Sequence, residues 1–107
     1  MNTNIEAAVS RFIDRFTQNG KRQEVIDCFT NGCCFWFAHT LYARFVYEAD
    51  CSLMYDDIMN HFGCQIDGRI YDITGDITEK YRWKTWIEAY EEDELRGQRI
   101  FRDCIDF

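Results

Sequence analysis

Apolar residues near the start of the chain recur at steps of three and four, a spacing typical of one face of a helix. The pattern extends over residues 4–17, with Thr3 as a suitable N-cap and Asn19-Gly20 as a stop signal. A shorter helical segment is predicted over residues 22–29, before a loop that ends in glycine. We therefore expect the chain to begin with two helices.

A more apolar helix is predicted over residues 34–45. Its first residue, Cys34, lies on the same face as Phe37, Ala38 and Leu41. The segment therefore predicts a buried helix that begins at a cysteine.

Three strand-like segments follow, at residues 51–55, 61–66 and 69–73. The last two are joined by Asp67-Gly68, a pair that is favoured in two-residue hairpin turns. We expect these two segments to form an antiparallel hairpin.

The hairpin turn also predicts the register of the two strands. It places Gly63 opposite Asp72, and cross-strand partners point to the same face of a sheet. His61 lies two residues from Gly63 on that face. His61 and Asp72 are therefore expected to be diagonal neighbours.

The remainder of the chain is polar and aromatic, and it predicts one broken helix or two consecutive helices over residues 85–94 and 95–104. A length of 107 residues suits one domain, residues 1–107, with no linker or repeat. The predicted fold class is α+β, with N-terminal helices packed on a short antiparallel sheet and C-terminal helices after it.

Composition narrows the classes of function. The hydrophobic fraction of 47% supports a packed core, and the net charge of −7 repels phosphate backbones, which argues against nucleic acid as a partner. We find no signal peptide and no apolar run long enough to span a membrane, so we expect a cytoplasmic protein without membrane association.

Six cysteines in such a protein predict reduced thiols. The cysteines and histidines show neither the C-x-x-C nor the H-x3-5-H spacing of zinc sites, so we expect no metal and no cofactor.

One cysteine is placed for chemistry. Unpaired N–H groups and the helix dipole at a helix start stabilise a thiolate, and Cys34 occupies that position. We predict Cys34 as nucleophile, His61 as its base and Asp72 as the group that orients the imidazole. The backbone N–H of Cys34 is a natural oxyanion donor, and Asn31 or Gln23 is a candidate for a second donor.

The segments NGCCFWFAHTL and NHFGCQIDGRIYDITGDIT contain a longer pattern, made by Cys34 with Phe37-Ala38, His61 with Phe62, and Tyr71-Asp72 with Gly75. In this pattern, over about residues 31–78, the chain resembles a family of small phage and prophage proteins of papain-like fold. The resemblance implies a minimal papain-like fold and cysteine-peptidase-like chemistry through a Cys-His-Asp triad.

Two alternatives concern the choice of residues. Cys33 is adjacent to Cys34, but the spacing to Phe37-Ala38 favours Cys34 as the nucleophile. The alternative is that neither thiol is catalytic and both are core residues. His39 lies about 140° around the helix axis from Cys34, so a direct hydrogen bond between them is not expected.

The resulting hypothesis is a hydrolase, deamidase or acyltransferase that acts on an amide, ester or isopeptide bond of an unknown protein or peptide, such as a host protein. The alternative is a catalytically silent scaffold that binds and inhibits a host protein, with the acidic run at residues 91–94 as a surface; a solvated helix face is the simpler interpretation of that run. Redox sensing by Cys33 and Cys34 is disfavoured because a disulfide between adjacent cysteines is strained.

Overall fold

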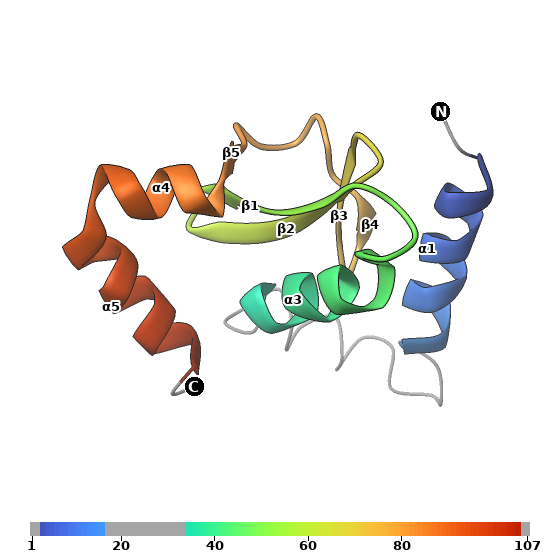
Figure 1. Ribbon diagram of the computed structural model, residues 1–107, viewed down its shortest axis with the longest axis horizontal. Coiled ribbons are helices and arrows are strands. Elements are labelled where there is room, and N and C mark those ends of the chain that lie inside the picture. Colours follow the sequence, from blue (N-terminus) through green and yellow to red (C-terminus); the bar gives the residue numbers. More distant parts are fainter. Residues whose placement is uncertain (1–2, 17–33, 106–107) are drawn as a thin grey trace.

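The computed structural model describes residues 3–16 and 34–105. In chain order these form α1 (Thr3–Phe16), α3 (Cys34–Phe45), β1 (Cys51–Asp56), β2 (His61–Ile66), β3 (Arg69–Asp72), β4 (Gly75–Asp76), β5 (Lys84–Thr85), α4 (Trp86–Glu92) and α5 (Glu94–Ile105) (Figure 1). The α+β class is confirmed. The helix expected over residues 22–29 lies outside the described residues.

The five strands form one antiparallel sheet in the order β4-β3-β2-β1-β5. Three of them were expected, and the two outermost, β4 and β5, were not. Each outer strand has only two residues, which is too short to show an alternating pattern. Their pairing depends on the neighbouring strand; for example, Thr85 lies opposite Met54 of β1.

The predicted register of the β2–β3 hairpin is confirmed. Cys64 pairs with Tyr71 and Ile66 with Arg69, and the same register places Asp72 beside Gly63. The two turn residues have positive φ angles, 53° at Asp67 and 90° at Gly68, as the tight hairpin turn requires.

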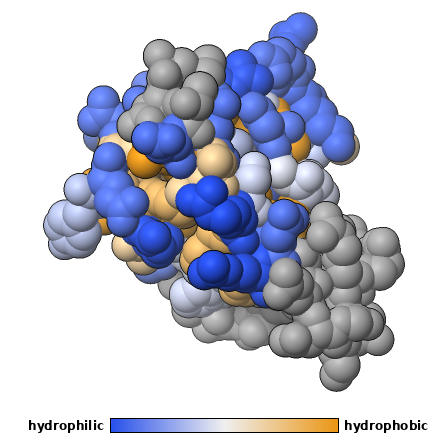
Figure 2. Space-filling model, turned by 90° about the vertical axis from the view of Figure 1, so that its right-hand side faces the viewer, coloured by the Kyte–Doolittle hydropathy of each residue, from blue (hydrophilic) through white to orange (hydrophobic). Residues whose placement is uncertain are grey.

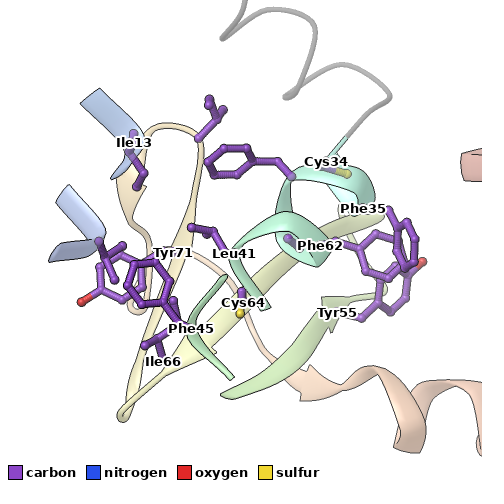
Figure 3. Packing of buried hydrophobic residues seen from close by; sticks show 14 of the residues in the cluster. Ile13, Cys34, Phe35, Leu41, Phe45, Tyr55, Phe62, Cys64, Ile66 and Tyr71 are labelled. Carbon is purple, nitrogen blue, oxygen red and sulfur yellow. The ribbon is translucent and has the colours of Figure 1, made fainter. Parts of the chain in front are cut away.

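Helix α3 packs along one face of the sheet and forms the main core with it (Figure 1). Leu41 and Phe45 of α3 lie close to Cys64 and Ile66 of β2 (Figure 3), and all four side chains are fully buried. The apolar side of α1 joins the same core through Ile5, Val9 and Ile13. Because these three residues are buried, the apolar side of α1 is turned inward. Seen from the α1 side, the surface shows an apolar area bordered by hydrophilic residues (Figure 2).

The opposite face of the sheet carries a second apolar cluster, in which Tyr81 and Trp83 pack against buried side chains. Gly63 permits this packing, because a Cβ there would lie 2.9 Å from Cγ2 of Ile70 and 3.2 Å from the Trp83 ring. The absence of a side chain at Gly63 therefore leaves room for Trp83 on this face of the sheet.

The C-terminal helices differ slightly from the expected division. Thr85 lies outside α4 as its N-cap, and its hydroxyl accepts a hydrogen bond from the backbone N–H of Glu88. Asp93 lies between α4 and α5 and is the C-cap of α4. Its carboxylate accepts a hydrogen bond from the N–H of Arg96, so it also caps the start of α5. The acidic run at residues 91–94 is exposed. No helix in residues 3–16 or 34–105 is long and apolar enough to cross a membrane.

Candidate functional site

Cys34 is the first residue of α3 and is 8% exposed. The N–H of a residue at this position has no acceptor within the helix, so the sulfur lies where negative charge is stabilised. Figure 3 shows the Cys34 sulfur at the start of α3, well separated from that of Cys64 in the core. Three residues considered with it, Cys33, Asn31 and Gln23, lie outside the described residues.

His61 is the first residue of β2, and Asp72 is the last residue of β3. The imidazole Nε2 lies 2.8 Å from Oδ2 of Asp72, and the two residues are 7% and 5% exposed. The proximity predicted from the hairpin register is therefore observed. Because the carboxylate accepts, the proton on Nε2 is held between the two side chains.

Cys34 also lies near the imidazole, close enough that its side chain contributes to a raised pKa of His61. Since Nε2 is bonded to Asp72, the nitrogen left for Cys34 is Nδ1. The structure thus brings together the three residues predicted from the sequence, with His61 in the middle.

Opposing effects determine the charge of this group. Burial lowers the pKa of His61, but the hydrogen bonds to Asp72 and Cys34 and the charges of both outweigh burial and raise the pKa to about 9. Burial raises the pKa of Asp72, whereas hydrogen bonds from His61 and Thr74 dominate and lower it overall. At neutral pH the imidazole of His61 is therefore protonated and paired with the carboxylate of Asp72.

Thr74 holds Asp72 in place. Oδ1 of Asp72 accepts one hydrogen bond from the backbone N–H of Thr74, at 2.7 Å, and another from its hydroxyl. This leaves Oδ2 for His61. Thr74 was not expected at the site, although the sequence contains a signal for it: Asp-Ile-Thr occurs twice, and Asp76 accepts the same two hydrogen bonds from Thr78.

Two aromatic side chains cover the imidazole. The Tyr81 ring stacks on His61 with centroids 4.9 Å apart and planes at 26°, and Trp83 lies 6.2 Å away. Burial raises the pKa of Tyr81, and the charges of Asp72, Asp56 and Cys34 raise it further. Tyr81 therefore lies close enough to Cys34 for an electrostatic interaction between the two side chains. Neither ring was singled out from the sequence, because their position depends on packing across Gly63.

The remaining described candidates lie elsewhere. His39 is exposed and contacts the rings of Phe35 and Trp36, as expected for a residue outside the site. Cys51 and Cys64 are free thiols whose side chains contact each other; burial is the largest cause of the raised pKa of each, which disfavours a reactive thiolate. Within the described ranges, no group of three or more histidine, cysteine or acidic side chains is arranged to hold a metal ion.

Comparison with known proteins supplies a family. No curated protein and no solved structure matched the chain. A family model described as "Phage YunG-like protein" matches residues 9–101. The matched segment contains Cys34, His61 and Asp72 and covers most of the chain. The chain therefore belongs to the Phage YunG-like protein family.

Proposed function

We propose that this protein is a cytoplasmic thiol hydrolase or acyl-transfer enzyme of papain-like type, which acts on an amide, ester or isopeptide bond of a protein or peptide. One observation carries the proposal: the buried imidazole of His61 is hydrogen-bonded to the carboxylate of Asp72 and lies near the thiol of Cys34 at the start of α3. A histidine with a purely structural role requires no cysteine at a helix start beside it. It also requires no raised pKa. The order of Cys34, His61 and Asp72 along the chain, with a helix packed on the sheet that carries the last two, supports the papain-like assignment.

The proposed reaction begins from a thiolate at Cys34 and an imidazolium at His61. The sulfur attacks the carbonyl carbon, and the backbone N–H of Cys34 is placed to stabilise the resulting oxyanion. The imidazolium then gives its proton to the leaving amine or alcohol, whose bond to carbon breaks to leave a thioester. His61, now neutral, takes a proton from water or from an acceptor amine, which attacks the thioester and releases the thiolate.

Each remaining residue has a defined part in this scheme. Asp72 keeps the proton on Nε2, so that Nδ1 faces the sulfur, and it stabilises the imidazolium. Thr74 fixes the orientation of Asp72 through its two hydrogen bonds. Asn31 and Gln23 remain candidates for a second oxyanion donor.

The test is the rate of alkylation by iodoacetamide, followed for each cysteine by mass spectrometry. We expect Cys34 to react fastest at pH 7, and His61→Ala to slow that reaction by roughly tenfold or more, with partial recovery at high pH. His39→Ala is the matched control, because His39 is an exposed histidine on α3 outside the site. The proposal is contradicted if Cys34 is alkylated no faster than Cys51, or if His61→Ala leaves the alkylation rate of Cys34 unchanged.

The alternative function is a catalytically silent scaffold that binds and inhibits a host protein. The exposure of the acidic run at residues 91–94 is the observation in its favour. Two of its members have structural partners, since Glu92 pairs with Lys84 and Asp93 caps α5. Charge reversal at Glu91 and Glu94 therefore tests this surface, and a salt-dependent loss of binding to a host protein would support it.

A further inference from the structure

An open groove of about 550 Å³ lies beside the proposed site. One wall comes from the turn between β1 and β2 and carries Ile58 and Met59. The other wall comes from the segment before β5 and carries Lys80, Tyr81 and Arg82. The groove therefore runs between two segments that flank the start of β2.

This groove is connected to the proposed site through two residues that contact or pair with His61. Tyr81 forms part of its wall and also stacks on the imidazole of His61. Asp56, at the inner end, is the cross-strand partner of His61. A peptide in the groove can therefore contact Tyr81, whose ring lies against the imidazole.

The apolar part of the groove is unusually exposed. Ile58 is 70% exposed and Met59 is 65% exposed, although large apolar side chains near a cleft are normally covered. Both belong to the short turn that separates β1 from β2, so their position is fixed by the hairpin. They offer a contact surface for an apolar side chain.

The groove is lined by two acidic and two basic side chains, of which the acidic ones already have partners. Glu79 is held by two hydrogen bonds from Arg69, at 2.9 and 3.0 Å, and Asp56 is 2% exposed and accepts a hydrogen bond from the N–H of Ile58. Lys80 and Arg82 are exposed and have no ion pair within the described part of the chain. These two cations are therefore the charged groups of the groove that can pair with an acidic ligand.

We infer that the substrate is a peptide segment that places an apolar side chain against Ile58 and Met59 and an acidic side chain against Lys80 and Arg82, with its acyl carbon at Cys34. This inference rests on the proposed function and adds the substrate class to it. The net charge of −7 favours basic segments on the rest of the surface, so the preference for an acidic side chain comes from the short-range attraction of Lys80 and Arg82 in the groove.

The inference is tested with three chloroacetylated dipeptide amides, which carry Leu-Glu, Leu-Lys or Gly-Glu. The Cys34 sulfur displaces chloride from the chloroacetyl carbon and forms a thioether, and the second-order rate constant is measured by mass spectrometry. We expect the Leu-Glu probe to react about fivefold faster than the Leu-Lys probe at low salt, with a smaller ratio at high salt. It should also react faster than the Gly-Glu probe.

Substitutions in the groove test whether its side chains cause the preference for the Leu-Glu probe. Lys80→Glu combined with Arg82→Glu should reverse the order of the Leu-Glu and Leu-Lys probes, whereas Arg99→Glu, an equally exposed cation on α5, should leave the order unchanged. Met59→Ser should remove the advantage of leucine over glycine. Because these side chains are exposed, the fold should be retained, as circular dichroism will show.

Iodoacetamide is too small to occupy the groove, so its reaction tests the proposed function separately from the substrate preference of the groove. Fast, His61-dependent alkylation by iodoacetamide without discrimination among the three probes overturns the groove inference and leaves the proposed function intact. Slow, His61-independent alkylation overturns the proposed function and the inference with it. Fast alkylation with the expected probe order and its reversal supports both.

Discussion

Replacing Asp72 by asparagine tests the charge balance of the site most directly. The substitution keeps the size of the side chain but removes its negative charge, and a single amide oxygen cannot serve both His61 and Thr74 as the two carboxylate oxygens do. Burial, which lowers the pKa of His61, stays the same. We expect the pKa of His61 to fall from about 9 by at least about one unit.

The effect on stability follows from the same shift. The pKa of His61 rises from 6.5 to about 9 in the folded protein, and at 1.36 kcal/mol per unit this is about 3 kcal/mol as an order of magnitude. A pKa that folding raises gives stability that is complete below pH 6.5 and is lost as the pH rises through about 9. Cys34 contributes part of this shift, so Asp72→Asn should destabilise the protein by about 1–3 kcal/mol near pH 6 and by much less near pH 10.

NMR titration of the ring protons measures the pKa, and urea unfolding at several pH values measures the stability. The chain has only two histidines, so the exposed His39 is an internal reference in the same spectrum. If His61 titrates near 6.5 in the unsubstituted protein, or keeps its pKa in Asp72→Asn, the charge assignment is refuted. Equal destabilisation at pH 6 and pH 10 would mean that packing, and not charge, explains the loss.

Three further substitutions test how the site is supported. Gly63→Ala should cost about 1–3 kcal/mol in urea unfolding, because the new methyl group would lie 2.9 Å from the buried Ile70 side chain; unchanged stability would contradict the close packing. Thr74→Val should raise the pKa of Asp72, measured by carboxyl NMR, by removing a hydroxyl donor, and Thr74→Ser should restore it. Thr85→Ala should cost about 1 kcal/mol through loss of the α4 cap, with no change in Cys34 alkylation.

Sequence patterns predicted those parts of the structure that depend on local information. The bounds of α3 and β2 agree with prediction, because periodicity and turn chemistry are encoded in consecutive residues. The contact between His61 and Asp72 could be predicted because Asp67-Gly68 determines the hairpin register. Cys34 could be placed at a helix start, and the papain-like assignment stays a prediction.

The features missed by the sequence analysis depend on distant residues. Tyr81 and Trp83 lie in a segment without regular structure, and their contact with His61 requires a sheet surface left open by Gly63. The short outer strands exist only because they pair with longer ones. The division between α4 and α5 was placed one residue late, since the capping role of Asp93 was not recognised within an acidic run.

The two contacts of His61 differ in their cost during folding. Asp72 lies 11 residues from His61 on the same hairpin, so closing this loop requires little chain entropy and depends on local contacts. Cys34 belongs to a separate helix, which reaches His61 only when α3 has docked on the sheet. A brief undocking of α3 would separate the thiol from an intact imidazole–carboxylate pair, so alkylation of Cys34 also reports how often this helix leaves the core.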